Sequence, residues 1–233
     1  MPGLRDLDWA YRQTGLYTAC SENATGTRLL EETMETRASS RRDQLLETAA
    51  ELFYRNGCHT TGIDRLLAEA GVAKMTLYKH FKSKENLVLA VATRLNDQLR
   101  EEFEQVAEQR KLSPRGQLLA LVDLLQEWCQ RPDFCGCPMV NLAVQYPDPK
   151  HPIHQAAAEN KRFRIDYISD LARRAGAKDP QRLATEIVLL LEGAVVMVQT
   201  TGDSALVERA REGIGKLVEL ELGPEDEASA VGQ

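Results

Sequence analysis

From Arg41 to about Leu222, apolar residues recur at helical spacing, and this periodicity constrains the fold of the 233-residue chain more than any other feature. Leu45, Ala49 and Leu52, for example, share one face of a helix with a period of 3.6 residues. We find no convincing stretch that alternates apolar and polar residues as a half-buried strand does, and no internal repeat. The sequence therefore predicts an all-α fold.

Glycine, proline and capping residues divide this pattern into three short helices, one long connector and about five longer helices. We expect Asn56-Gly57 to end the first helix, Thr60-Thr61 to cap the second and Gly71 to end it. Ser83 caps the connector, and Ser113-Pro114 marks a break after it. The expected helices cover about residues 41–56, 63–70, 74–80, 84–106, 118–129, 138–146, 153–175, 179–200 and 205–222.

Charge is distributed unevenly along the chain. The net charge is −6, but residues 38–84 carry eight Lys/Arg and five Asp/Glu, which gives +3 and leaves −9 for the rest. No acidic residue lies between Lys74 and Lys84. A small basic module on an acidic body indicates that only this end meets phosphate groups.

The segment Ile63–Phe81 has the pattern of a helix-turn-helix. Ala68 is small where two helices must cross closely, and Gly71 permits the tight turn between them. Val72 and Leu77 are apolar and fill the space between the helices. The residues left to project from the second of these helices are Lys74, Met75, Thr76, Tyr78, Lys79 and His80.

A dense series of motifs spans residues 41–88: Ala49–Phe53, Gly57, Thr60-Thr61, Ala68–Val72, Thr76–Phe81 and Ser83–Glu85. In this series the chain resembles the DNA-binding domain of the tetracycline-repressor (TetR/AcrR) family. Two positions depart from the family pattern, since Ala73 stands where serine is frequent and Met75 where glycine is frequent. Both departures lie in the element that would decide which operator is read.

The resemblance implies a role for each matching position. Thr61 would contact a phosphate, and Lys84 would close the site at the start of the connector, where the helix dipole favours an anion. Met75 either touches a base or packs sideways, and Phe81 is a core aromatic. Lys74, Thr76 and Lys79 would face the major groove, and Tyr78 and His80 would bond to backbone phosphates. For Tyr78, packing in the core is the alternative.

The resemblance also implies the domain organisation and the function. We expect a helix-turn-helix DNA-binding domain at 38–84, a ligand-binding and dimerisation domain at 85–223 and a flexible tail at 224–233. Residues 1–37 are interpreted as a disordered tail or as a mis-annotated leader ahead of a true start at Met34. The function is that of a ligand-responsive transcriptional regulator, a repressor released from a pseudo-palindromic operator when a small molecule binds. Activation instead of repression stays open.

Weaker resemblance continues in Gly136–Pro138, Tyr146–Pro149 and Leu190–Ala194. The helix at 179–200 is apolar nearly all round, so it needs a partner surface in addition to its own core. With the helix at 205–222 it would form a two-fold four-helix interface in a homodimer.

Candidate residues for an effector pocket are aromatic, polar or flexible side chains of the C-terminal domain: Phe103, Trp128, Met139, Asn141, Tyr146, Phe163, Tyr167, Glu192 and Gln199. For each aromatic residue and for Met139, ordinary core packing is the alternative. Glu192 lies in an apolar helix and needs a partner, which could be a ligand amine, a buried arginine or water at an interface edge.

The five cysteines are Cys20, Cys58, Cys129, Cys135 and Cys137, and no secretory signal precedes them. We therefore expect free thiols in a reducing cytoplasm. Cys137 precedes Pro138 at a predicted helix start, so it is either a redox-sensitive thiol with Cys135 or a small buried residue. The Cys-x-Cys spacing does not fit structural zinc with His151 and His154, and we expect no metal and no cofactor.

Two other classes of protein fit the sequence less well than a regulator does. A thiol enzyme using Cys135 and Cys137 would need a nucleotide loop or a catalytic triad, and the sequence has neither. A purely structural helical protein would not need the lysines of residues 74–84. A membrane protein is also not expected, because the apolar run Ile187–Val198 contains Glu192 and is shorter than a bilayer-spanning helix.

Overall fold

The computed structural model describes residues 28–109 and 112–223, with side chains described over 40–103 and 112–223. The chain divides into two units, Met1–Ser40 and Arg41–Gln233. Of the first unit, the structure describes residues 28–40. The interpretations of residues 1–27 and 224–233, and Cys20, lie outside the described residues.

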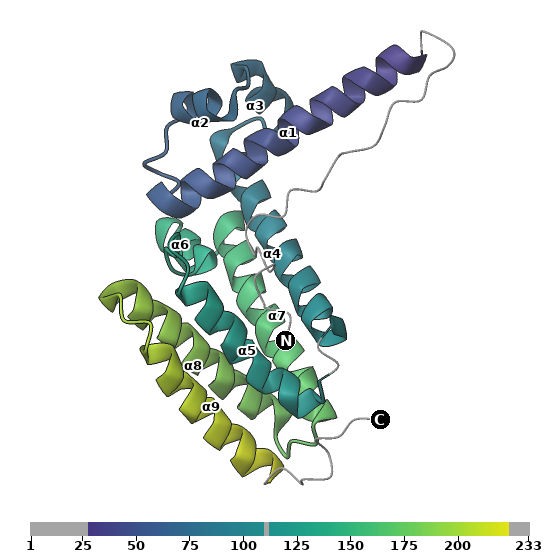
Figure 1. Ribbon diagram of the computed structural model, residues 1–233. Coiled ribbons are helices and arrows are strands. Elements are labelled where there is room, and N and C mark those ends of the chain that lie inside the picture. Colours follow the sequence, from purple (N-terminus) through teal and green to yellow (C-terminus); the bar gives the residue numbers. More distant parts are fainter. Residues whose placement is uncertain (1–27, 110–111, 224–233) are drawn as a thin grey trace. The chain divides into compact units, whose positions relative to one another are not determined.

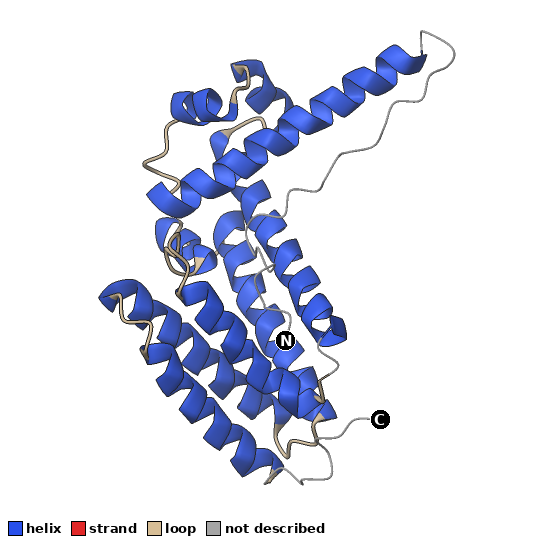
Figure 2. Ribbon diagram, viewed as in Figure 1, coloured by secondary structure: helices blue, strands red, loops and turns tan. Residues whose placement is uncertain are grey.

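Every regular element in the described ranges is an α-helix, which confirms the predicted all-α fold (Figure 2). The helices, labelled in Figure 1, are α1 (Arg28–Asn56), α2 (Ile63–Ala70), α3 (Lys74–His80), α4 (Lys84–Gln109), α5 (Pro114–Cys129), α6 (Pro138–Gln145), α7 (Pro152–Arg174), α8 (Pro180–Thr201) and α9 (Leu206–Leu222).

Two helices begin earlier than expected. The helix α1 starts at Arg28, ahead of Met34 and Arg41, because residues 28–40 contain neither glycine nor proline and several strong helix formers. The helix α5 starts at Pro114, so Ser113-Pro114 is its beginning and not only a break. The Ser113 hydroxyl caps α5 by accepting a hydrogen bond from the Gly116 N–H at 3.1 Å.

The expected capping of α2 by Thr60-Thr61 is wrong. The N-cap of α2 is Gly62, and no side chain caps that helix. The Thr61 hydroxyl instead donates to the Gly57 carbonyl at 2.7 Å, and the Thr60 hydroxyl also donates to carbonyls at the end of α1. Both threonines therefore close the first helix, whose carbonyls would otherwise be unpaired.

The helix α7 organises the C-terminal half, since it packs against α4, α5, α6 and α8 (Figure 1). It buries apolar residues along its length, including Ile153, Ile168 and Leu171. A buried amide pair also joins it to the connector α4. Asn160 donates to the Asn96 side chain at 2.7 Å, and Asn96 donates to the Ala156 carbonyl at 3.0 Å. These contacts fix how the connector lies against the C-terminal domain.

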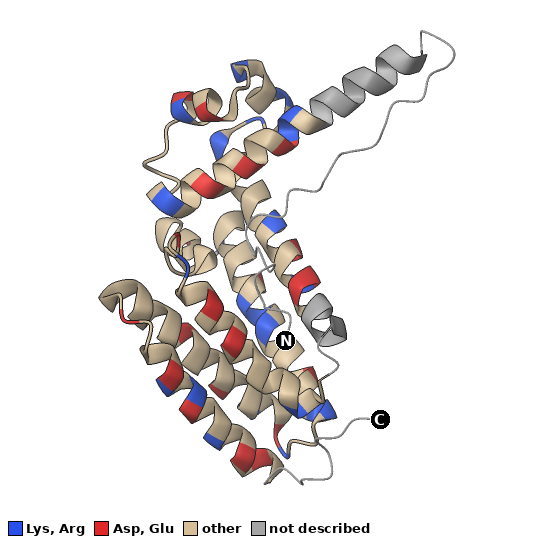
Figure 3. Cartoon of the chain, in the orientation of Figure 1, with Lys and Arg blue, Asp and Glu red and all other residues tan. Residues whose placement is uncertain are grey.

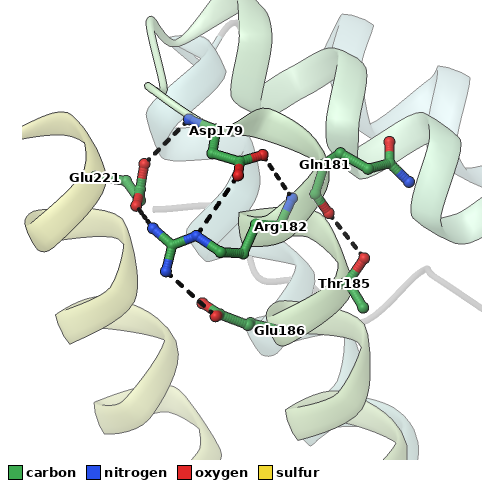
Figure 4. A network of polar contacts seen from close by, with 6 residues as sticks. All are labelled: Asp179, Gln181, Arg182, Thr185, Glu186 and Glu221. Carbon is green, nitrogen blue, oxygen red and sulfur yellow. Dashed lines mark hydrogen bonds and ion pairs between the residues drawn. The ribbon is translucent and has the colours of Figure 1, made fainter.

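The helices α8 and α9 form an adjacent antiparallel pair, held at one end by the polar network in Figure 4. Glu221 near the end of α9 is only 6% exposed and pairs with Arg182 in the first turn of α8. Its other oxygen accepts the Asp179 N–H at 3.3 Å, while Asp179 caps α8 as predicted by accepting the Arg182 N–H at 3.1 Å. The close approach of the pair is visible at Gly213, where a β-carbon would lie 3.4 Å from Leu190.

Within the described residues, α8 is the one helix long and apolar enough to cross a membrane, with a mean hydropathy of 1.6 over its best window. It has 22 residues, so the length argument made from the shorter run Ile187–Val198 does not hold for the whole helix. The core helix of a bundle has the same length and composition. Eight of its residues, among them Leu183, Ile187 and Val195, are buried within the protein, and we assign α8 to that core.

Candidate nucleic-acid interface

The turn between α2 and α3 has the geometry that the sequence predicts. Gly71 is left-handed, with φ of 60°, and its N–H donates to the Ala68 carbonyl at 3.3 Å. Leu66 on α2 and Leu77 on α3 are both fully buried. Burial of these two leucines sets one face of α3 against the domain and leaves the other face to solvent.

The outer face of α3 is exposed and basic. Lys74, Met75, Tyr78 and Lys79 are exposed, with Met75 at 74% and Tyr78 at 42%. Thr76 and His80 are half-buried. The helix α3 has no acidic residue, whereas α2 carries acidic residues, as the colours of Figure 3 show. A surface of this kind can approach a phosphate backbone without charge repulsion.

Two expected contact residues are placed differently from the sequence interpretation. The Thr61 side chain is fully buried and donates to the Gly57 carbonyl, which is inconsistent with the phosphate contact that the resemblance implied. Lys84 is half-buried, and its ammonium donates to the His59 carbonyl at 3.5 Å. It therefore braces the turn after α1 from the start of α4.

Lys82 also belongs to this surface, although the sequence did not lead us to predict it. Lys82 lies between α3 and α4, is exposed, and has a left-handed backbone with φ of 65°. Its charge extends the basic surface of α3, and the signal available in the sequence was its position in the acid-free stretch of residues 70–84. Phe81 is buried as expected, beneath the Arg42 guanidinium at 5.3 Å.

Gln145 provides one of the contacts between the DNA-binding module and the C-terminal domain. The Gln145 side-chain oxygen, at the end of α6, accepts hydrogen bonds from the Cys58 N–H at 2.8 Å and the His59 N–H at 3.3 Å. The Cys58 thiol lies 3.0 Å from the same oxygen, and the His59 ring pairs with the Gln145 carbonyl at 2.8 Å. These bonds join the end of α6 to the turn between α1 and α2.

A cleft of about 630 Å³ opens beside this junction. Its walls come from the end of α1, the α5–α6 loop, α6 and the end of α8. Of the nine pocket residues expected from the sequence, Asn141 and Gln199 line it and are hydrogen-bonded to each other at 3.3 Å. Phe53 and Phe134 give the cleft apolar surface, and Arg55 adds a cation.

The other candidate pocket residues lie in separate places. Phe103, Phe163 and Tyr167 form an aromatic cluster between α4 and α7, with the Phe103 and Tyr167 rings 4.7 Å apart. Trp128 packs edge-on against Phe134 at 5.1 Å, and Met139 is buried in α6. Tyr146 stacks between two histidine rings, those of His59 and His151. The nine residues therefore do not form one pocket.

Glu192 has protein partners. Its Oε1 atom accepts from Lys161 and from Arg164, each at 2.6 Å, so the requirement for a partner is met by two cations of α7. Burial acts to raise the pKa of Glu192, but Lys161 and Arg164 outweigh it and hold that pKa below its ordinary value. A ligand amine is not needed to explain this carboxylate.

Two family models match the chain. Residues 45–91 match the model for bacterial regulatory proteins of the tetR family, and residues 114–214 match a tetracyclin repressor-like C-terminal domain. The chain belongs to the TetR family. It is therefore a helix-turn-helix transcriptional regulator and not an enzyme, and proteins of this family bind operator DNA and dimerise.

Individual relatives agree with this assignment. The transcriptional regulator YjdC of Escherichia coli is 25% identical over 72% of this chain and 88% of its own length. The transcriptional activator FasR of Mycolicibacterium smegmatis is 49% identical, but over only 25% of this chain and 27% of its own. A solved TetR-family regulator from Streptomyces coelicolor is 29% identical with a TM-score of 0.75, covering 79% of this chain and 97% of that one.

The Glu192 cluster gives a testable dependence of stability on pH. Because the pKa of Glu192 is lowered in the folded protein, its ion pairs stabilise the fold above the ordinary value of 4.5, and this contribution is lost as pH falls through the lowered pKa. Glu192→Gln leaves two cations without their carboxylate, so we expect a loss of about 1–3 kcal/mol at pH 7 in urea unfolding. The difference between wild type and variant should shrink below pH 4.5. A constant difference between pH 7 and pH 3 would show that the carboxylate charge does not contribute.

Proposed function

We propose that this regulator is a ligand-responsive repressor that binds a pseudo-palindromic operator through the outer face of α3. The observation that carries the proposal is the exposed, acid-free surface of α3, held outward by the burial of Leu77. Lys74 and Lys79 supply positive charge to it, and Met75 supplies an apolar contact that a thymine methyl group can meet.

The proposed role of each residue is the one that the family resemblance implies. Lys74, Thr76 and Lys79 face the major groove, and Tyr78 and His80 bond to backbone phosphates. Lys84, together with Lys82, adds charge where α4 begins. Thr61 is left out of the proposed interface because its side chain is buried. In this arrangement only a few residues read bases, and the rest set position on the duplex.

A homodimer brings two such modules to one operator. The proposed interface is an exposed stripe on α8, formed by Leu189, Gly193, Val196 and Met197, which recur at helical spacing. Leu189 is 66% exposed, and Gly193 has open space where a side chain would be. A second copy of the stripe would cover this apolar surface, with α9 alongside to complete four helices.

The proposed effector site is the cleft beside Gln145. It has both apolar walls and polar groups, as small-molecule sites do. A ligand there would touch α1, α6 and α8 at once, and α6 ends in the glutamine that holds the turn between α1 and α2. Binding would shift the population of conformations that present the two α3 helices at operator spacing. Because Arg55 lies in its wall, the cleft suits an amphipathic molecule with an anionic group.

The sign of regulation is proposed to be negative. One relative, 37% identical over 30% of this chain, is a transcriptional repressor of Mycolicibacterium smegmatis, whereas FasR is an activator. Deletion of the gene should therefore raise transcription of the operon next to its operator, and a fall would show activation. A cytoplasmic location, where DNA is present and thiols stay reduced, is part of the same proposal.

The α3 surface is tested with Lys79→Ala and DNA from upstream of the protein's own gene. Loss of one phosphate-facing charge should weaken binding about fivefold and reduce the slope of log K against log salt by about 0.9. Fluorescence anisotropy at several salt concentrations measures both. Lys178→Ala, an exposed lysine after α7, is the matched control and should change neither. If Lys79→Ala keeps the wild-type slope, Lys79 does not lie in the interface.

The α8 stripe is tested with Leu189→Glu. A carboxylate placed in an apolar self-contact should dissociate the dimer at micromolar concentration, which sedimentation velocity detects as a monomer. Leu112→Glu, at an exposed leucine before α5, should remain dimeric. A dimeric Leu189→Glu protein would place the interface elsewhere.

The cleft is tested with the apolar anion 1-anilinonaphthalene-8-sulfonate as a probe. Val144 is 74% exposed in the cleft wall, and Val144→Trp should weaken probe affinity about fivefold by filling part of the space. Asp170→Trp adds the same side chain on the exposed surface of α7 and should leave the affinity unchanged. Equal affinities for both variants would show that the probe binds outside the cleft.

A further inference from the structure

We infer that Cys135 and Cys137 form a hydroperoxide-reactive thiol pair in which Cys137 reacts first and Cys135 closes a disulfide. Both thiols lie in the loop between α5 and α6, and neither forms a disulfide in this structure. The effect of this oxidation on DNA binding rests on the proposed function, whereas the thiol chemistry does not.

Cys137 is placed beside positive charge. The Lys161 ammonium donates to the Cys137 sulfur at 3.2 Å, and Cys137 occupies the N-cap of α6. Lys161 shares Glu192 with Arg164, so the three side chains carry one more positive than negative charge. A sulfur beside a cation and at a helix N-terminus has the kind of surroundings in which reactive cysteines are found.

Cys135 is positioned to complete the reaction. It is half-buried and lines the cleft, so small reagents and reductants reach it. Gly136 separates the two cysteines, and its φ of 83° is a backbone conformation that glycine adopts without strain. Two thiols so near in the chain can meet after a local change at Gly136, without movement of any helix.

The two other described thiols are buried, as Cys137 is, and for both of them burial is the largest influence on the pKa. Burial raises the pKa of Cys129 to about 11, and burial also raises the pKa of Cys58. Both are held in the unreactive thiol form. They serve as internal controls in the same molecule.

The chemistry balances with one hydroperoxide. The Cys137 thiolate attacks the terminal peroxide oxygen, the S–O bond forms, the O–O bond breaks, and the alkoxide or hydroxide that leaves takes up a proton. The Cys135 thiol then attacks the sulfur of the sulfenic acid, so the S–S bond forms and water leaves. Two thiols are oxidised, and the peroxide is reduced to an alcohol or water.

The loop that would change connects the two functional domains. The Cys135 N–H donates to the Tyr54 hydroxyl of α1 at 2.8 Å, and the Cys135 carbonyl accepts from Asn141 and Gln199, each at 3.0 Å. A side chain at Gly136 would collide with Gln199, so the loop lies directly on α8. A disulfide requires the two sulfur atoms at about 2.05 Å, and the Cys135 peptide that bonds to Tyr54 lies in the segment that must change to form it. Oxidation therefore removes the Tyr54 contact between α1 and this loop, while the Gln145 contacts remain.

The test treats the full-length protein with hydrogen peroxide and follows intact mass and alkylated peptides with time. The wild type should lose 2 hydrogens, about 2 Da, with residues 135 and 137 linked, and dithiothreitol should reverse the change. Cys135→Ser should stop at a Cys137 sulfenic acid that dimedone traps. Cys129→Ser should behave like wild type. Reaction at Cys58 or Cys129 before Cys137 would overturn the proposal.

The role of Lys161 is tested with variants that remove or keep its positive charge. Lys161→Met should slow oxidation at Cys137 about tenfold or more, and Lys161→Arg should restore most of the rate. Circular dichroism checks that each variant is folded. Equal rates in Lys161→Met and wild type would remove Lys161 from the mechanism.

DNA binding is measured separately with the same oxidised samples. Oxidised wild type should bind upstream DNA at least about fivefold more weakly than reduced protein, and Cys137→Ser should not respond to peroxide. If the disulfide forms but reduced protein binds no DNA, the proposed function fails and the thiol chemistry stands. If reduced protein binds DNA and no disulfide forms, only this inference fails.

Discussion

Packing around α7 is the constraint on which the rest of the described structure depends. This helix contacts α4, α5, α6 and α8. Its buried residues therefore position both the connector α4 and the helix α6, whose end contacts the DNA-binding module. The Asn96–Asn160 pair fixes α4 on one side, and the Lys161–Glu192 pair fixes α8 on another. Loss of either partner would leave a polar group inside the protein without its hydrogen bond, which is costly. The positions of α4, α7 and α8 along one another are therefore specified by polar contacts as well as by apolar area.

The helix-turn-helix could be predicted from sequence because its determinants are local. Gly71 is left-handed, Leu77 is buried and the lysines of α3 are exposed, and each of these follows from spacing within about twenty residues. The ends of α8 were equally local, since Asp179-Pro180 is a cap followed by a first helical residue. Local chemistry also explains the misplacement of Thr61, because a threonine before a helix can either cap that helix or close the preceding one.

The candidate site in the C-terminal domain was less predictable, since it depends on contacts between distant segments. Nothing near Glu192 in the sequence identifies Lys161 and Arg164 as its partners. Asn141 and Gln199 meet at the cleft because α6 and α8 approach each other, whereas Phe103, Phe163 and Tyr167 pack elsewhere. Eight of the nine candidates are buried or half-buried and Gln199 is exposed, but residue type could not group them into one cavity.

The contact at Gln145 has a consequence for building hybrid regulators. One side-chain oxygen accepts two backbone N–H groups of the turn between α1 and α2, and the thiol of Cys58 lies within hydrogen-bonding distance of it. A DNA-binding module moved onto another C-terminal domain would lose this acceptor unless the new domain ends its sixth helix in the same way. Donors left without a partner would loosen the turn, and the hybrid would bind DNA without responding to its effector. Exchangeability of the two domains therefore depends on the residue at the end of α6 as well as on the overall similarity of the partners.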